Sequence, residues 1–220
     1  MKALIVANGE LEEGGWWRTQ VADATWIIAA DGGASNALRV GLMPQIVIGD
    51  LDSLDEELLT HLQAHGSRLM QHSSRKDETD TELALKYAVE LGATEIYILG
   101  ALGGRLDHAL ANILSLAMPE LADAETYIVT RHCVISLIRH EARFEGQVGD
   151  ILSLLPVGGD VTGITTEGLE YPLHGDTLRF GPARGISNVL TAPVARVRIG
   201  GGLLLALKFT GNDSGRSEKA

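Results

Sequence analysis

Short apolar segments alternate with amphipathic helical segments through the first 130 residues of the chain, and the alternation then stops. Apolar, β-branched runs predict strands at residues 2–7, 26–30, 44–48, 68–71, 95–99 and 127–129. Helical spacing predicts helices between them, at residues 31–40, 55–65, 79–91 and 105–117. Strands that alternate with helices favour a parallel sheet, because each crossover helix returns the chain to the same edge.

From residue 131 to residue 208 only short strands are predicted, separated by Gly, Pro, Asn and Asp. They lie at residues 134–138, 142–144, 151–155, 161–164, 176–180, 187–190, 194–199 and 203–209. We therefore expect an α/β fold, with a parallel-sheet α/β domain at residues 1–130 and an all-β, sandwich- or barrel-like domain at residues 131–210. The polar residues 211–220 are expected to form a disordered tail.

Charge and cysteine content exclude several classes of protein. A net charge of −11 argues against a nucleic-acid-binding protein, which would need clustered Lys and Arg. Cys133 is the only cysteine, so an internal disulfide and a multi-thiolate metal site are excluded. No apolar run is long enough to cross a membrane and residues 1–30 do not resemble a signal peptide, so we expect a soluble, cytoplasmic protein.

Two carboxylates, Asp50 and Asp52, directly follow the strand at 44–48. The carboxyl ends of parallel strands are where open α/β sheets bind ligands, and Gly49 permits a turn that aims both side chains inward. Such a pair suits a hard divalent cation. A helix cap is an equally good interpretation of the turn by itself, because Ser53 or Asp55 could cap the helix that follows.

Three further turns combine glycine, acidic and basic residues. Asp31-Gly32-Gly33 links a strand to a helix, although its spacing is not a dinucleotide fingerprint and a tight turn explains it equally well. Residues 74–82 place Arg75 and Lys76 before Asp77, Thr79, Asp80 and Glu82; a capping box explains Thr79 and Glu82, but not the two basic residues. The third turn, Gly103-Gly104-Arg105, opens a helix whose buried side we expect at residues 106, 110, 113, 114 and 117.

Taken together, these turns indicate Mg²⁺-assisted chemistry on a nucleotide polyphosphate. The cation would neutralise phosphate charge, and Arg and Lys would stabilise the charge that develops in the transition state. No Gly-x-x-x-x-Gly-Lys-Ser/Thr motif is present, so a P-loop enzyme is excluded.

The sequence also resembles the thiamine pyrophosphokinase (thiamin diphosphokinase) family. The resemblance rests on residues 30–34, 49–53, 76–80, 103–108 with Asn112, and 185–188, in the family's order and spacing. It implies transfer of the diphosphate of ATP to the hydroxyl of thiamine, giving thiamine diphosphate and AMP. It further implies an ATP-binding α/β catalytic domain, a thiamine-binding β domain, Mg²⁺, and a homodimer with the active site between subunits.

Site residues are implied by position in these motifs. Asp50, Asp52 and Asp80 would hold Mg²⁺, and Arg105 and Asp107 would join them in catalysis, with Asp107 orienting the acceptor hydroxyl or accepting its proton. ATP would be contacted by Asp31, Gly32, Gly33, Lys76, Asp77, Thr79, Arg105, His108 and Asn112. Thiamine would meet Tyr171, Ser187 and Asn188, and an aromatic face is physically suited to its cationic ring.

Three other functions remain compatible with these motifs. The acceptor could be another hydroxymethyl compound, such as a pterin, bound by the β domain. Asp50 could instead be the nucleophile of a phosphohydrolase, with Asp52 as its acid or base, although that motif normally follows the first strand. A nucleotide sensor without turnover is the third alternative.

Overall fold

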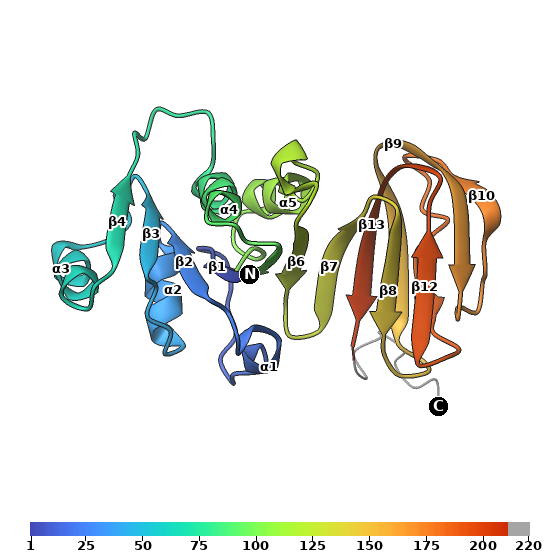
Figure 1. The fold of residues 1–220 in the computed structure, drawn as a ribbon, viewed down its shortest axis with the longest axis horizontal. Coiled ribbons are helices and arrows are strands. Elements are labelled where there is room, and N and C mark those ends of the chain that lie inside the picture. Colours follow the sequence, from blue (N-terminus) through green and yellow to red (C-terminus); the bar gives the residue numbers. More distant parts are fainter. Residues whose placement is uncertain (211–220) are drawn as a thin grey trace. The chain divides into compact units, whose positions relative to one another are not determined.

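The computed structural model describes residues 1–210, so the tail expected at residues 211–220 lies outside the described part of the chain. Two compact units make up the fold, one formed by Met1–Arg131 and one that begins at His132 (Figure 1). Within residues 1–210, no helix has both the length and the apolar character needed to cross a bilayer.

The first unit contains a six-stranded sheet in the order β4-β3-β2-β1-β5-β6. Its strands are β1 (Lys2–Val6), β2 (Trp26–Ala30), β3 (Ile46–Gly49), β4 (Arg68–Gln71), β5 (Glu95–Leu99) and β6 (Glu125–Val129). Every neighbouring pair is parallel, so the α/β prediction for this part of the chain is confirmed. Residues 3–6 of the central strand β1 are completely buried, as expected for a parallel sheet covered on both faces.

The helices of this unit are α1 (Arg18–Val21), α2 (Gly33–Arg39), α3 (Glu56–Ala64), α4 (Asp80–Glu90) and α5 (Leu106–Ser115), with a 3₁₀ turn at Pro119–Leu121. In Figure 1, α4 and α5 lie on one side of the strands, and α1 and α2 lie on the other. Two helix starts are capped as the sequence predicts. Asp55 accepts a hydrogen bond from the backbone of Leu58 at the start of α3, and Thr79 and Glu82 form a capping box on α4.

The prediction of which side of α5 is buried is wrong. Leu106, Leu110 and Leu114 are exposed by 82%, 53% and 49%, whereas the polar residues Asn112 and Ser115 are buried. Hydrophobic spacing reveals that a helix has an apolar face but not which face meets the sheet. Here the helix packs through its smaller and polar side chains, and Asn112 is held there by a hydrogen bond to the preceding turn.

Within residues 132–210, all strand pairs of the second unit are antiparallel, with strands in the order β7-β13-β9-β12-β8 and with β10 and β11 paired to β9. Its strands are β7 (Cys133–Ile138), β8 (Glu141–Glu145), β9 (Ile151–Glu167), β10 (His174–Leu178), β11 (Asn188–Val189), β12 (Val194–Arg198) and β13 (Gly201–Phe209). The prediction of an all-β unit after the α/β unit is therefore confirmed. Its core is one aliphatic cluster that includes Leu152, Ile164, Leu190, Val197 and Leu204.

One strand of this unit differs from the prediction. The segments expected as separate strands at 151–155 and 161–164 form the single strand β9, although Pro156 and two glycines lie between them. Gly158 has a φ of +74°, and the register with β13 shifts between Gly201 and Leu203. The chain is thus bent by an irregularity where a break was expected, because pairing with β13 continues on both sides of it.

Candidate active site

A cleft of about 410 Å³ lies in the first unit, lined by turns that follow the carboxyl ends of its strands. Asn8 follows β1, Asp31 follows β2, Asp50 follows β3 and Ala101 follows β5. The remaining wall includes Lys76, Thr79 and Asp80 at the start of α4, and Arg105, His108 and Asn112 around the start of α5. The cleft therefore combines carboxylates with cationic side chains at the edge where parallel sheets bind ligands.

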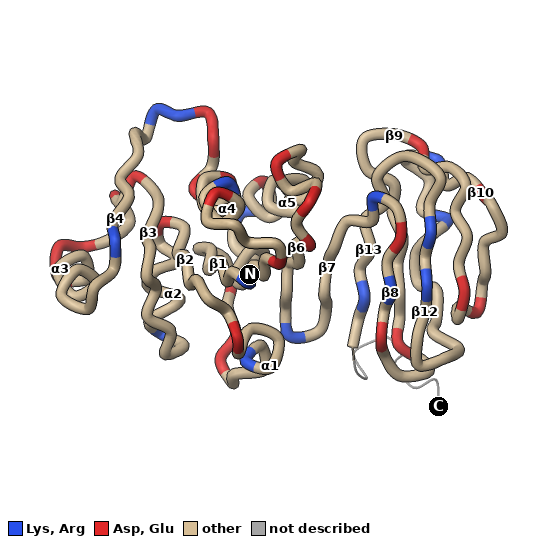
Figure 2. The backbone as a smooth tube through the Cα atoms, viewed as in Figure 1, with Lys and Arg blue, Asp and Glu red and all other residues tan. Residues whose placement is uncertain are grey.

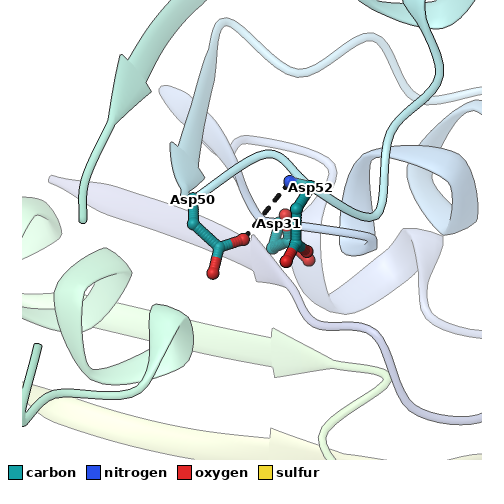
Figure 3. Close-up of side chains that lie close together, drawn as sticks. All are labelled: Asp31, Asp50 and Asp52. Carbon is teal, nitrogen blue, oxygen red and sulfur yellow. Dashed lines mark hydrogen bonds between the residues drawn. The ribbon is translucent and has the colours of Figure 1, made fainter. Parts of the chain in front are cut away.

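Three carboxylates converge beside this cleft. One oxygen atom from each of Asp31, Asp50 and Asp52 lies within 4.8 Å of the other two (Figure 3). The backbone N–H of Asp52 donates a 3.3 Å hydrogen bond to Asp50 Oδ1, and Leu51 between them has a positive φ of 64°. This turn brings together side chains that an extended strand would point to opposite sides. Hydrogen bonding with Asp50, together with the negative charge of Asp50, raises the pKa of Asp52.

Asp31 is the most buried of the three, with 9% of its surface exposed. Its φ of 46° is unusual for a residue other than glycine, and within residues 1–210 its Oδ1 has no hydrogen-bond partner. A buried carboxylate oxygen without a donor is costly unless a cation approaches it. The donor set also fits a hard cation, because Mg²⁺ binds oxygen ligands and favours carboxylates.

This group differs from the predicted metal ligands Asp50, Asp52 and Asp80. The structure adds Asp31 to the first two, while Asp80 lines the cleft with its Oδ1 2.8 Å from Lys76 Nζ. The sequence shows that Asp31 follows a strand, but only the structure shows that this strand, β2, is the neighbour of β3 in the sheet. Two acidic turns on adjacent parallel strands are expected to meet at the same edge.

The segment before α4 carries basic residues followed by acidic ones, as Figure 2 shows between β4 and α4. Lys76 has only 14% of its side chain exposed and lies against Asp80, and Lys86 pairs with Glu78 at 3.1 Å. Thr79 lines the cleft and caps α4 with its side chain. Asp77, expected to contact ATP, is exposed and is not among the described residues that line the cleft.

Arg105 and Asp107 form a two-pronged ion pair at the start of α5. The Arg105 Nε lies 3.1 Å from Asp107 Oδ1, and its Nη2 lies 2.6 Å from Oδ2. The backbone N–H of His108 also donates to Oδ1, at 3.0 Å. The hydrogen bonds from Arg105 are the main reason that the pKa of Asp107 is lowered to about 2.

Asn112 and the glycines after β2 have structural contacts that explain their presence. The Asn112 side-chain amide is buried and donates a 2.8 Å hydrogen bond to the carbonyl of Ala101, which steadies the turn after β5. A Cβ at Gly33 would collide with the carbonyl oxygen of Val6, and one at Gly32 would collide with the side chain of Asn8. Both glycines therefore allow α2 to start close to β1, and neither is among the described cleft-lining residues.

A second pocket, of about 290 Å³, lies in the all-β unit and is lined by Tyr171, Leu173, Arg184, Ile186 and Asn188, among others. Asn188 is buried, and its amide is occupied by backbone: Oδ1 accepts from the N–H of Tyr171, and Nδ2 donates to the Tyr171 carbonyl, at 3.0 and 2.8 Å. It therefore holds the backbone beneath the exposed Tyr171 ring. Ser187 has a φ of 57° and donates its N–H to Ser153 Oγ, and it is not among the described lining residues.

Several residues of these two pockets were not expected from the sequence. Asn8, Ser74 and Glu78 line the first, and Arg184 and Leu154 line the second. Asn8 marked only the end of a strand in the sequence, and Arg184 belonged to no motif. Their membership depends on which turns are adjacent in space, which local sequence patterns do not reveal.

Comparison with protein families matches both units of the chain. Residues 17–128 match the model "Thiamin pyrophosphokinase, catalytic domain", and residues 137–204 match "Thiamin pyrophosphokinase, vitamin B1 binding domain". This chain belongs to the thiamin pyrophosphokinase family. The resemblance seen in the sequence is thereby confirmed.

Individual members of the thiamin pyrophosphokinase family agree with this assignment. Thiamine pyrophosphokinase of Bacillus subtilis (strain 168) is 30% identical over 191 residues, which cover 83% of this chain and 86% of that protein. Thiamine pyrophosphokinase 2 of Oryza sativa subsp. japonica is 30% identical over 208 residues, covering 83% and 77%. The crystal structure of thiamin pyrophosphokinase from Geobacillus thermodenitrificans matches with a TM-score of 0.83 and 28% identity, over 97% of this chain and 100% of that chain.

Proposed function

We propose that this protein is a thiamine diphosphokinase that transfers the diphosphate of Mg-ATP to the hydroxyl of thiamine, giving thiamine diphosphate and AMP. Membership of the thiamin pyrophosphokinase family supports the reaction class and both substrates. The observation that carries the proposal is the convergence of Asp31, Asp50 and Asp52 beside a cleft that Lys76 and Arg105 also line. Carboxylates for a cation and two cationic side chains for phosphate are what diphosphoryl transfer requires.

Asp31, Asp50 and Asp52, here called the acidic group, would hold Mg²⁺. Asp80 would become a further ligand if the Lys76 side chain left it to bind a phosphate. The bound cation would neutralise phosphate charge and act as a Lewis acid on the transferred group. Lys76 and Arg105 would stabilise the negative charge that moves onto the leaving AMP oxygen. Thr79, His108 and Asn112 line the same cleft and would position the nucleotide.

The acceptor would occupy the pocket of the all-β unit. The exposed ring of Tyr171 offers a face for a cationic heterocycle, and Asn188 fixes the backbone that carries it. Neither pocket contains both the residues proposed to bind Mg-ATP and those proposed to bind thiamine. The aspartates belong to the first unit and Tyr171 belongs to the second. We propose a cytoplasmic homodimer in which the active site lies between subunits, as the sequence resemblance implied.

No observation favours a pterin acceptor, a phosphohydrolase or a sensor without turnover. An assay with ATP, Mg²⁺ and thiamine tests the proposal directly, with thiamine omitted or replaced by a hydroxymethyl pterin as controls. We expect AMP and thiamine diphosphate in equal amounts. Formation of ADP or free phosphate, or AMP formed only with the pterin, would refute the assignment to thiamine.

A further inference from the structure

The role of Asp107 is decided by what its carboxylate already contacts. Both oxygens are engaged by Arg105, and Oδ1 also accepts the backbone N–H of His108. A general base needs a free lone pair directed at the proton it removes and a pKa near the working pH. Asp107 is poorly suited to that role, since three donors occupy all but one of the lone-pair positions of its carboxylate and Arg105 lowers its pKa to about 2.

The position of Asp107 relative to the cleft leads to the same conclusion. Arg105 and His108 are both lining residues, whereas Asp107 between them is not among the described residues of the cleft wall. Asp107 therefore contacts Arg105 and His108, which line the cleft proposed to bind the nucleotide. A residue in that position can act on a bound nucleotide through Arg105.

The geometry of the ion pair leaves Arg105 able to bind phosphate. A guanidinium carries five N–H donors in a rigid plane. Asp107 occupies the edge formed by Nε and Nη2, which leaves the N–H groups of Nη1 and the second N–H of Nη2 free within residues 1–210. That remaining edge can grip two phosphate oxygens at once. The Asp107 carboxylate therefore orients the Arg105 guanidinium and leaves the edge that would bind phosphate unoccupied.

Orientation matters here because the Arg105 side chain is 75% exposed. A long, solvated side chain loses rotamer entropy when it is immobilised on a ligand, and a partner that holds it beforehand reduces that loss. We infer that Asp107 is a positioning residue that fixes the Arg105 guanidinium for the phosphates of the nucleotide, and that it does not remove the proton of the acceptor hydroxyl. This inference rests on the proposed function and assigns one residue of that site.

A simpler explanation is that Asp107 only stabilises the start of α5, where an acidic residue is favoured by the helix dipole. That explanation accounts for the bond to the backbone of His108. It does not require the two-pronged contact with Arg105, and it predicts no effect on nucleotide affinity. Glu57 is a matched control, because it is an exposed acidic residue in the first turn of α3 and does not line the cleft.

The test measures nucleotide binding without turnover. Binding of a non-hydrolysable ATP analogue with Mg²⁺ is measured by calorimetry, in the absence of thiamine, for wild type, Asp107→Asn, Arg105→Lys, the double variant and Glu57→Gln. We expect Asp107→Asn to weaken binding about tenfold, which corresponds to about 1.4 kcal/mol. The double variant should bind no more weakly than Arg105→Lys, because the two residues act as one unit. Glu57→Gln should bind like wild type.

Kinetics with thiamine and ATP complete the test. Asp107→Asn should raise the KM for ATP more than it lowers kcat, and the acid limb of the pH–kcat profile should be retained. Unchanged nucleotide affinity, together with a kcat that falls by about 10²-fold or more and loss of the acid limb, would identify Asp107 as the base and overturn the inference. A lower melting temperature with unchanged affinity would also overturn it in favour of helix stabilisation.

The outcome is separable from that of the proposed function. If wild-type protein forms no thiamine diphosphate, the proposed acceptor is wrong. The binding series still decides whether Asp107 acts through Arg105, because it contains no acceptor.

Discussion

The close approach of β3 to Asp31 predicts that Gly49→Ala will damage the acidic group. A Cβ built at Gly49 would lie 2.8 Å from Asp31 Cβ and 3.1 Å from its Cα, where ordinary van der Waals contact begins at 3.4 Å. Neither neighbour is the end of a flexible side chain, and the Asp31 N–H is tied to the carbonyl of Ile48 at 2.8 Å. The two turns must therefore separate by roughly half an ångström, which moves the Asp31 carboxylate relative to Asp50 and Asp52.

Overpacking of this kind costs about 1–3 kcal/mol of unfolding free energy. In a protein of this size each kcal/mol lowers the melting temperature by about 2–4 °C. Thermal unfolding of wild type and Gly49→Ala, each with and without Mg²⁺, measures both consequences. We expect a lower melting temperature for the variant and a smaller increase on adding Mg²⁺, since a cation that binds only the folded state stabilises it according to its affinity.

Gly159→Ala is the control, because a Cβ there would have no neighbour within 4 Å among the described residues and the backbone is not left-handed. It should melt like wild type and respond to Mg²⁺ in the same way. The reasoning fails if Gly49→Ala keeps the wild-type melting temperature and the wild-type response to Mg²⁺. In that case the turns after β2 and β3 would be more adaptable than their packing indicates.

Three further predictions concern the proposed cation site, the cap of α4 and the proposed acceptor pocket. Asp52→Asn should lower kcat by several orders of magnitude with an unchanged circular dichroism spectrum, because it removes a carboxylate from the proposed cation site; a near-normal rate would exclude Asp52 from that role. Thr79→Ala should destabilise the fold by about 1 kcal/mol in denaturant unfolding, since the cap on the Glu82 N–H is lost, whereas Thr79→Ser should have little effect; equal losses would argue against the cap. Asn188→Ala should lower unfolding free energy by about 1–3 kcal/mol and raise the KM for thiamine more than that for ATP, because the backbone of Tyr171 is released; an equal rise in both constants would disprove that link.

Local patterns in the sequence were sufficient to predict most of the elements of the fold. The bounds of β4 and β5 agree with the predicted segments, and the caps of α3 and α4 were visible as Asp55 and as the pair Thr79 and Glu82. Such features depend on residues within one or two turns of each other. The motifs that predict phosphate and cation binding are equally local, which is why the family resemblance is visible in the amino-acid sequence alone.

Predictions that depended on a residue's neighbours in space were less successful. The leucines of α5 were expected inside and are exposed, and β9 was divided at Pro156 although pairing with β13 carries it through. In both cases the local pattern was compatible with two arrangements. Which arrangement forms depends on the neighbouring element in the fold, and the local sequence pattern carries no information about that element.

The sequence by itself determined the α/β and all-β units, the turns that carry the acidic and basic residues, and membership of the thiamin pyrophosphokinase family. Only the tertiary structure decided that Asp31 joins Asp50 and Asp52, and that Asn188 holds the backbone of Tyr171. The reason is physical. Burial and hydrogen bonding between elements depend on strand order and register, which are set by long-range packing and not by local sequence patterns.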